Sequence, residues 1–421
     1  MRTLIPAVLL LLVPASGFSS VRLTYELQNG PTALAWSQAS FPIPIAVGNR
    51  AAQGLPLGEA LIRSAFDVWE NVEGGGVSFT SAGMTDASAG RDGVNLVTIA
   101  DKMFESSGML AFTTTWFDEK TGELLEVDIQ IDPATVRESV GLRTMVQHEI
   151  GHLLGFDHSG VVSSVMYPWV GPEDLGGLDS DDVVALTALY PGNPGKQGAG
   201  AIRGEVRLPG GGVFGAQVVA VDVHGAPIAS TLSGEGGIFA LEGIPAGEYR
   251  LYAEPLDGPV EQKNLAGVWR ERAISSFRTE FSAPMRVHAG SQINGVEIRV
   301  SDIPDDLNPR WIGAFAPNST EIRLGSTVAS ITAGREIGIA VGGDGIVGGL
   351  TEFEVLNPGF HRTGDFRFGP NYLWATFRVD KDATPGSVVI VARNGGVQAA
   401  LTGAIRVVKP AGSSRGRIVG R

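Results

Sequence analysis

The chain has 421 residues with 45 acidic and 32 basic side chains, a net charge of −13, and no cysteine. This acidity argues against a nucleic-acid partner, because phosphate backbones are bound by basic faces. The missing cysteines exclude disulfide scaffolding and thiol chemistry. The length predicts about two to four domains, and the 58 glycines and 24 prolines that interrupt short apolar runs predict β-rich modules.

The first residues carry the pattern of a secretory signal. Arg2 precedes an apolar run over 4–13, and small residues follow around 15–17. This order is typical of a signal peptide, and the apolar run is too short to serve as a membrane anchor. We therefore predict a signal peptide over 1–17, a secreted protein, and no stable insertion into a membrane.

Residues 35–192 mix helix and strand patterns, which predicts an α+β domain. Apolar residues at helical spacing predict a helix over 56–72, and a second helix leads into a histidine cluster. A short helix is predicted over 180–190, with Asp179 or Ser180 as its N-cap. Strands are predicted over 41–48, 76–82, 93–101, 108–117 and 123–132.

Three of the six histidines lie within eleven positions, in the sequence HEIGHLLGFDH. On a helix, His148 and His152 are one turn apart and about 40° apart around the axis. The apolar side chains on the other side of this helix are Leu142, Val146, Ile150, Leu153 and Leu154. The helix therefore turns two imidazoles away from the core, toward a cleft in which they can bind one metal ion.

Gly155 explains how a third ligand can reach the same ion. Glycine can adopt the left-handed conformation that ends a helix and redirects the chain, which brings His158 back toward the first two histidines. Three imidazole nitrogens leave the fourth position of a tetrahedral Zn²⁺ to water, as in catalytic sites. Zinc lowers the pKa of that water toward about 7. We therefore predict one catalytic zinc held by His148, His152 and His158, with Glu149 as general base.

The full string H-E-x-x-H-x-x-G-x-x-H resembles the zinc-binding motif of the metzincin peptidases. That family also has a methionine turn under the metal, and SSVMYP supplies Met166 eight residues after His158. The resemblance implies that Met166 forms an apolar floor and does not coordinate. HEIGHLLGFDHS, VMYP and LDSDDVVALTALYPG resemble matrixin signatures in matrixin order, and ALIRSAFDVWENV resembles the first matrixin helix. Over 35–192 this implies a twisted mixed sheet with an active-site helix.

The chain departs from the animal matrixins in two respects. No histidine precedes His148, so the second, structural zinc of that group is not expected, and a chain without cysteine cannot use cysteine-based latency. Matrixins also bind calcium through carboxylates and carbonyls. The acidic side chains that could hold Ca²⁺ here are Asp118, Glu119, Asp128 and Asp132, and a solvated turn is the alternative.

The resemblance also implies where a polypeptide substrate would bind. The segment 108–116 resembles the edge strand above the cleft, so a peptide would pair with its main chain. Leu110 and Ala111 are the candidate contacts, and a plain sheet strand is the alternative. Tyr167 and Pro168 begin the segment that would form the wall of the pocket for the residue after the cut bond.

Two carboxylates open the last helix of this region. Asp181 and Asp182 lie where the helix dipole favours negative charge. The resemblance implies that one of them packs under the active site or pairs with the mature N-terminus. Plain helix capping is the alternative.

The remainder of the chain carries strand and turn patterns without a helix. After a linker at 193–200, residues 201–302 contain GGIFALEGIPAGEYRL and resemble a carboxypeptidase regulatory-like, or transthyretin-like, β-sandwich. Residues 310–408 resemble a bacterial immunoglobulin-like domain. Both are predicted to be antiparallel β-sandwiches, and 409–421 a disordered tail. Such modules usually act as spacers, and contact with carbohydrate or the cell wall is the alternative.

The sequence thus predicts a secreted bacterial zinc endopeptidase followed by two all-β modules. Zinc-activated water and the glutamate base would hydrolyse peptide bonds of extracellular proteins. The alternative is a cell-surface adhesion or binding protein that uses a catalytically weak metzincin scaffold. An intact ligand set with Glu149 beside it favours the enzyme. The natural substrate, the activation route and the oligomeric state have no signal in the sequence.

Overall fold

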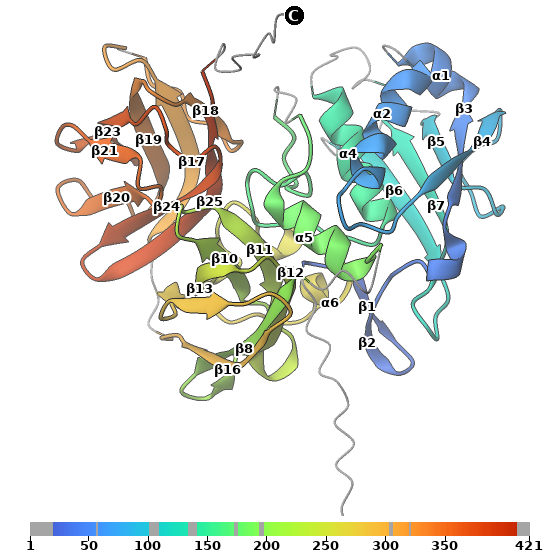
Figure 1. The fold of residues 1–421 in the computed structure, drawn as a ribbon, viewed down its shortest axis with the longest axis horizontal. Helices are drawn as coiled ribbons and strands as arrows, with labels where there is room; N and C mark the ends of the chain where they lie inside the picture. The colour runs from blue at the N-terminus through green and yellow to red at the C-terminus, as the bar shows by residue number, and fades with distance from the viewer. Residues whose placement is uncertain are drawn as a thin grey trace, which may run out of the picture.

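A computed structural model describes residues 20–55, 58–100, 109–133, 141–171, 176–192, 198–302, 306–319 and 321–410. The predicted signal peptide lies outside the described residues, as do most of the linker and nearly all of the predicted tail. Figure 1 shows three bodies, which we call the first region (20–192), the second region (198–302) and the third region (306–410). In the described part of the chain, no helix is both long and apolar enough to cross a membrane.

The first region is built on a five-stranded mixed sheet in the order β4-β3-β5-β7-β6. β3 pairs in parallel with β4 and β5, β5 pairs in parallel with β7, and β6 runs antiparallel to β7. β6 is therefore an edge strand. The strands are β3 (Ile43–Gly48), β4 (Phe79–Thr85), β5 (Leu96–Ile99), β6 (Ala111–Phe117) and β7 (Leu124–Ile131).

Two long helices, α2 (Gly58–Glu70) and α4 (Leu142–Leu153), pack against each other. α4 also packs against β6 and β7, and Phe66 of α2 packs against Phe79 of β4. α2 buries Ile62, Phe66 and Trp69, which recur at helical spacing and so form one apolar stripe. α4 is buried along nearly its whole length, because it lies between α2 and strands β6 and β7. The helices predicted over 56–72 and before the histidine cluster are thereby confirmed.

Three further helices and one hairpin complete the first region. The last helix, α5 (Ser180–Leu189), begins with a capping box in which the N-cap is Asp179. The sequence pattern did not predict η1 (Gln38–Ser40), α1 (Asn49–Gly54) or the hairpin of β1 (Thr24–Leu27) and β2 (Gly30–Ala33). Leu23 and Leu34 belong to the same core as α2 and α4, so the folded unit includes the hairpin.

The second region consists of two sheets that enclose one core. One sheet has the order β11-β10-β13-β14 with β15 beside β13, and the other has the order β12-β8-β16 with β9 beside β8. The strands are β8 (Gly200–Leu208), β9 (Gly211–Gly212), β10 (Gln217–Asp222), β11 (Pro227–Leu232), β12 (Ile238–Ile244), β13 (Gly247–Glu254), β14 (Glu280–Phe281), β15 (Met285–Val287) and β16 (Gln292–Arg299).

The third region repeats this two-sheet plan. Its sheets have the orders β17-β19-β23-β21, with β22 beside β23, and β18-β25-β24-β20. The strands are β17 (Asn308–Phe315), β18 (Ala329–Thr332), β19 (Glu336–Asp344), β20 (Thr351–Val355), β21 (Phe360–Arg362), β22 (Arg367–Phe368), β23 (Tyr372–Val379), β24 (Gly386–Asn394) and β25 (Val397–Val408).

Two expectations for these regions were wrong. The sheets are not purely antiparallel, since β8 pairs in parallel with β16 and β18 with β25. Each parallel pair joins strands far apart in the chain, so the connection can pass through the other sheet and needs no hairpin. The second region also contains helical turns: η2 (Glu235–Gly237), η3 (Gln262–Asn264) and α6 (Gly267–Glu271). These turns are too short for a periodicity signal.

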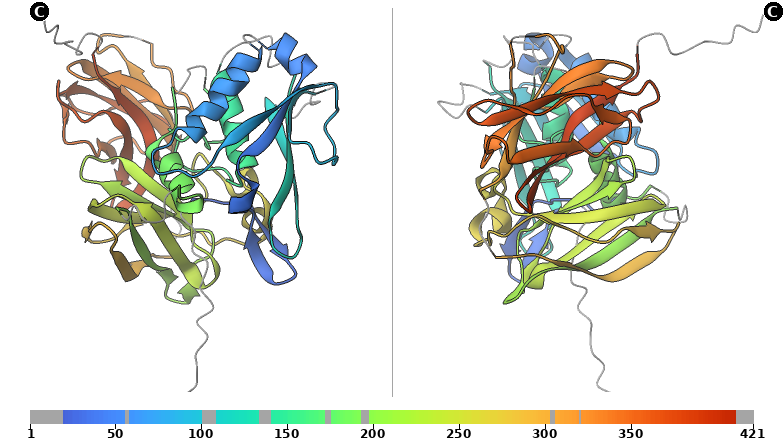
Figure 2. Two further views of the ribbon diagram at one scale, coloured as in Figure 1. Left: turned by 45° about the vertical axis from the view of Figure 1, so that its right-hand side comes forward. Right: turned by 90° about the vertical axis from the view of Figure 1, so that its left-hand side faces the viewer.

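The three regions are packed through shared apolar cores. Val162 and Tyr167 of the first region belong to the same core as Leu265 and Val268 of the second and Ile339 of the third. Figure 2 shows from two further directions that both β-regions lie against the side of the first region that carries α5. All three regions therefore contribute to the core beside the segment that follows the histidine helix.

Candidate metal centre

The three clustered histidines converge on one point. The ring centroids of His148 and His152 lie 4.7 Å apart, and that of His158 lies 5.1 Å and 4.9 Å from them. One nitrogen of each ring lies within 4.8 Å of the corresponding nitrogen of the other two. Such a set of three imidazoles is suited to one transition-metal ion.

The end of α4 places the third histidine. The N–H of Gly155 donates to the carbonyl of His152 (2.9 Å), and the N–H of Phe156 donates to the carbonyl of Gly151 (3.0 Å). This is the double hydrogen bond of a Schellman helix end, and Gly155 has the positive φ of +93° that it requires. A Cβ at this position would lie 2.6 Å from the carbonyl oxygen of Leu34. Glycine is therefore needed here both for its conformation and for space.

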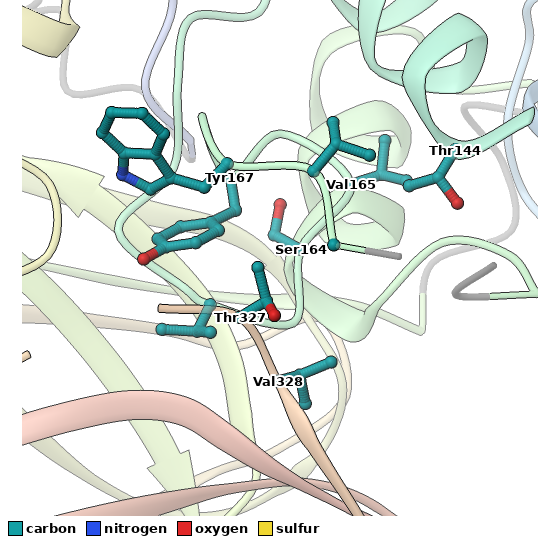
Figure 3. A pocket seen from close by; sticks show the side chains of 10 residues that line it. Thr144, Ser164, Val165, Tyr167, Thr327 and Val328 are labelled. Atoms are coloured by element: carbon teal, nitrogen blue, oxygen red, sulfur yellow. The ribbon is translucent and has the colours of Figure 1, made fainter. Parts of the chain in front are cut away.

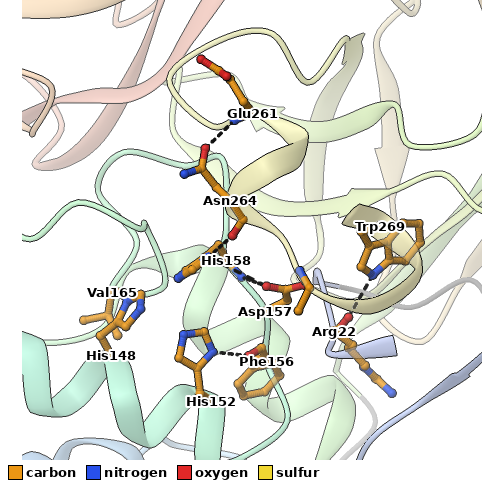
Figure 4. A network of polar contacts seen from close by, with 11 residues as sticks. Arg22, His148, His152, Phe156, Asp157, His158, Val165, Glu261, Asn264 and Trp269 are labelled. Atoms are coloured by element: carbon orange, nitrogen blue, oxygen red, sulfur yellow. Dashed lines mark hydrogen bonds and ion pairs between the residues drawn. The ribbon is translucent and has the colours of Figure 1, made fainter. Parts of the chain in front are cut away.

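A backbone carbonyl holds the Nδ1 of each ring, and Figure 4 shows these bonds for His152 and His158. His148 donates to Val165 (2.7 Å), His152 donates to Phe156 (2.8 Å), and His158 donates to Asn264 of the second region. Carbonyls only accept, so each Nδ1 carries a proton, and the lone pair of a neutral ring then lies on Nε2.

These hydrogen bonds fit the donor set that zinc requires, with oriented neutral imidazoles. Burial, with a further contribution from His158, lowers the pKa of His148 to about 3. Burial likewise lowers the pKa of His152 well below its usual range. Both rings therefore stay neutral at physiological pH, as metal binding requires.

Glu149 lies beside the first ligand and is held by the edge strand. Its carboxylate accepts a hydrogen bond from the hydroxyl of Thr113 in β6. Burial raises the pKa of Glu149 to about 7, and the bond from Thr113 acts in the opposite direction. A carboxyl with a pKa near neutrality can both accept and return a proton at physiological pH. No pattern in the sequence indicated Thr113.

Met166 packs directly beneath the histidine helix. A Cβ on Gly151 would lie 2.0 Å from the sulfur of Met166, so the thioether occupies the space that a larger residue in α4 would need. The methionine is buried in the same core as α4. This position matches an apolar floor beneath the metal ligands.

Asp182 holds the loop that carries Met166. Its carboxylate accepts hydrogen bonds from the hydroxyl of Ser164 (2.5 Å) and from the backbone N–H of Val165 (2.9 Å). It also accepts from the N–H of Asp179 (2.8 Å), which closes the capping box of α5. Asp182 therefore both caps the helix and supports the loop, so the two alternatives for this residue are not exclusive.

Asp181 ties the histidine loop to the second region. Its carboxylate accepts from the hydroxyl of Ser159 (2.7 Å), and from the backbone N–H (2.6 Å) and hydroxyl (3.1 Å) of Ser230 in β11. Burial raises the pKa of Asp181 to about 6, and these hydrogen bonds act in the opposite direction.

A segment of the second region reaches the third ligand. Besides the bond from His158 to Asn264, the carboxylate of Asp157 accepts from the N–H of Ala266 (2.8 Å). The amide of Asn264 closes its own turn by accepting from the N–H of Glu261 (2.9 Å). Residues more than a hundred positions away in the chain therefore help to orient the site.

The predicted substrate contacts differ in their exposure and in whether they line a cavity. Leu110 has 37% of its surface exposed, whereas Ala111 has 8% exposed and can offer a peptide only its main chain. Tyr167 lines a cavity of about 90 Å³ beside α4, together with Trp169 and Gly171. Pro168 lies between these residues without lining the cavity.

The acidic side chains considered for calcium do not gather at one point. Asp118 follows the end of β6, while Asp132 follows the opposite end of the β6–β7 pair. The carboxylate of Asp118 accepts from the N–H groups of Lys120 and Thr121 in its own turn. That of Asp128 accepts from the N–H groups of Gly90 and Leu96. These carboxylates hold backbone turns in the described structure, which favours the solvated-turn alternative for Asp118.

Comparison with known proteins finds a family similarity over part of this chain. Residues 56–191 match the matrixin family model (Peptidase_M10). The matrixin resemblance is thereby confirmed for that segment.

Three curated relatives show how far the similarity extends. Metalloendoproteinase 5-MMP of Arabidopsis thaliana is 39% identical over 77 residues, which are 18% of this chain and 21% of that protein. Karilysin of Tannerella forsythia is 48% identical over 52 residues, or 12% of this chain and 11% of that protein. The hatching enzyme of Paracentrotus lividus is 32% identical over 137 residues, which are 32% of this chain and 22% of that protein. The chain thus spans about a fifth or less of the length of these relatives, and the matches support a metallopeptidase.

Similarity to solved structures is weak. The major pilin subunit of Bacillus cereus aligns with a TM-score of 0.16 and 9% identity, over 50% of this chain and 69% of that chain.

Proposed function

We propose that this protein is a secreted zinc endopeptidase that cuts extracellular polypeptides. The observation that carries the proposal is the convergence of His148, His152 and His158, each with its Nδ1 held by a carbonyl, beside the buried carboxyl of Glu149. The matrixin match over 56–191 supports the same activity.

His148, His152 and His158 would hold the zinc through their Nε2 atoms. A bound zinc ion would supply a lowered pKa for a water molecule and a Lewis acid for the substrate carbonyl. Glu149 then takes a proton from the attacking water and delivers it to the amine that leaves when the C–N bond breaks. Thr113 holds the Glu149 carboxylate in place for both transfers.

The substrate would lie along the edge strand β6. One edge of β6 pairs with β7, and an extended peptide can add to the other edge through main-chain hydrogen bonds. Across the metal centre, the segment that begins with Tyr167 would form the wall of the pocket for the residue after the cut bond. Export of the protein rests on the signal pattern over 1–17.

The test compares the full chain with two glutamate variants on casein. We expect purified protein with one zinc per chain to cleave casein, to lose cleavage with a chelator, and to regain it when zinc is restored. Glu149→Gln should bind zinc and lose at least a hundredfold in kcat/KM. Glu73→Gln, in an exposed turn, is the matched control and should retain full activity.

Two outcomes would contradict the proposal. Wild-type protein that contains zinc and cleaves no peptide in a broad library would favour the adhesion or binding alternative. Full activity of Glu149→Gln would show that Glu149 is not the general base.

The inactive Glu149→Gln protein also serves to test whether the second and third regions bind peptidoglycan, since it can be incubated with cell walls without degrading them. The spacer role predicts no retention.

A further inference from the structure

The cavity beside α4 is closed by residues of the third region. Thr144 of α4, Val165 and Tyr167 contribute from the first region, and Thr327 and Val328 contribute from the segment before β18. Figure 3 shows these side chains around one space, with Thr327 and Val328 opposite Val165.

Two residues that line this cavity adjoin the first metal ligand, while the three histidines themselves do not line it. Thr144 lies one helical turn before His148, and the carbonyl of Val165 accepts the hydrogen bond from the Nδ1 of that histidine (2.7 Å). A side chain that enters the cavity would therefore extend from a peptide bond near the three imidazoles. The matrixin resemblance assigns the segment that begins with Tyr167 to the wall of the pocket for the residue after the cut bond, so under the proposed function this is the side chain on the carboxyl-terminal side of the cut.

The third-region segment is fixed against the pocket wall. The hydroxyl of Tyr167 donates to the carbonyl of Ser326 (2.8 Å). A Cβ on Gly171 would lie 3.1 Å from the side chain of Thr327, so the two segments are in close contact. Further along, the N–H of Val162 donates to the carbonyl of Thr402 (2.8 Å). Contacts on both sides of the cavity thus hold its third-region side in place.

The lining selects for an uncharged side chain of moderate size. Among the residues that the structure describes, the lining consists of valine, threonine, serine, glycine, tyrosine and tryptophan side chains, and none is ionised at neutral pH. A charged side chain would be desolvated there, with no opposite charge in the lining itself. The volume of about 90 Å³ is several times the space of one water molecule, which suits a valine, leucine or methionine side chain.

We infer that Thr327 and Val328 of the third region determine which side chain the peptidase accepts directly after the cut bond, with a preference for medium-sized aliphatic residues. The third region is then a part of the specificity pocket and more than a spacer. This inference rests on the proposed function, since it concerns the substrate of the same site.

The test uses the full chain with opposite changes at one position. Val328→Phe should narrow the cavity and Val328→Ala should widen it, while Val347→Phe, at a position in the same region with 43% of its surface exposed, is the matched control. Each protein is assayed on peptides that differ only at the residue after the cut, with alanine, leucine or phenylalanine there. Zinc content and thermal unfolding are measured in parallel.

We expect Val328→Phe to lower kcat/KM for the leucine peptide by about tenfold or more relative to the alanine peptide, since methylene-sized changes in a pocket have effects of this order. Val328→Ala should raise kcat/KM for the phenylalanine peptide relative to the leucine peptide. The control variant should show the wild-type ratios. The alanine truncation keeps the test valid if the phenylalanine variant does not fold.

The outcomes separate the inference from the proposed function. If wild type cleaves peptides and Val328→Ala keeps the wild-type ratios, the inference is wrong and the peptidase proposal stands. If zinc-loaded wild type cleaves none of the peptides in this set or in a broad library, the peptidase proposal fails, and the inference fails with it.

Discussion

Asp182 offers the sharpest test of how the loop under the metal is held. In Asp182→Ala, the buried N–H groups of Val165 and Asp179 lose the acceptors that lie 2.9 Å and 2.8 Å away. A buried donor left without a partner costs about 1–3 kcal/mol. Removing a buried carboxyl, whose pKa burial raises to about 7, offsets part of this cost. We expect a net loss of about 2–4 kcal/mol in the free energy of unfolding.

The same substitution should weaken zinc binding at a distance. Val165, which Asp182 holds by its N–H, accepts the hydrogen bond from His148 through its carbonyl (2.7 Å). Loss of an outer hydrogen bond of this kind typically lowers metal affinity by about 10–100-fold. Affinity is measured by competition with a chromogenic chelator, and stability by urea unfolding of the metal-free protein.

The control for Asp182→Ala is Asp67→Ala on the surface of α2. The carboxylate of Asp67 is 43% exposed and pairs with Arg63 at 2.8 Å, so its removal should change stability by less than about 1 kcal/mol and leave zinc affinity unchanged. If Asp182→Ala lowered the free energy of unfolding by only about 1 kcal/mol and kept wild-type zinc affinity, Asp182 would act only as a helix cap. Its carboxylate would then not hold the loop under the metal.

Three further predictions concern the base, the helix and a buried carboxyl. Thr113→Val removes a hydrogen bond that lowers the pKa of Glu149, so the pKa of this general base should rise. The acidic limb of the pH profile of kcat/KM should then move to higher pH while the zinc content stays unchanged. An acidic limb at the wild-type pH would contradict this. Gly151→Ala should lower the unfolding temperature, because its Cβ would lie 2.0 Å from the sulfur of Met166, whereas Gly90→Ala, with open space around it, should not. Burial raises the folded-state pKa of Glu254 to about 8, so the stability that this carboxyl contributes is full below its usual pKa and is lost as the pH rises toward about 8. Urea unfolding of metal-free protein should therefore show Glu254→Gln gaining stability relative to wild type as the pH rises from about 5 to about 8. A difference that does not change with pH would contradict this.

Local patterns in the sequence predicted the centre of the site and the elements that carry it. The spacing of His148 and His152 is a property of one helix, and the turn at Gly155 follows from conformations that few residues adopt. The stripe of Ile62, Phe66 and Trp69 likewise predicts its helix from neighbouring positions. In each case the decisive interactions are made within about two turns of chain.

The supports of the site could not be predicted in this way. Asn264 acts through its backbone carbonyl, which every residue possesses, and it lies 106 positions from His158. Thr113 is the first of three consecutive threonines, and only the register of β6 against its neighbours decides which hydroxyl meets Glu149. Val328 is one of many valines in a β-region, and only the docking of the third region places it at the pocket.

The carbonyls that orient the three histidines come from different parts of the fold, and this has a thermodynamic consequence. Phe156 belongs to the end of α4 itself, Val165 to a loop that α5 holds, and Asn264 to the second region. If docking of the second region orients His158 and so strengthens zinc binding, then zinc must strengthen that docking by the same factor, because the coupling between two equilibria is reciprocal. Zinc removal should therefore loosen the contacts of residues 261–266 before it affects the β-sheets. Protection of the Ala266 amide, which donates to Asp157, should fall on chelation. The amide of Ala220, which pairs within the second-region sheet, should remain protected.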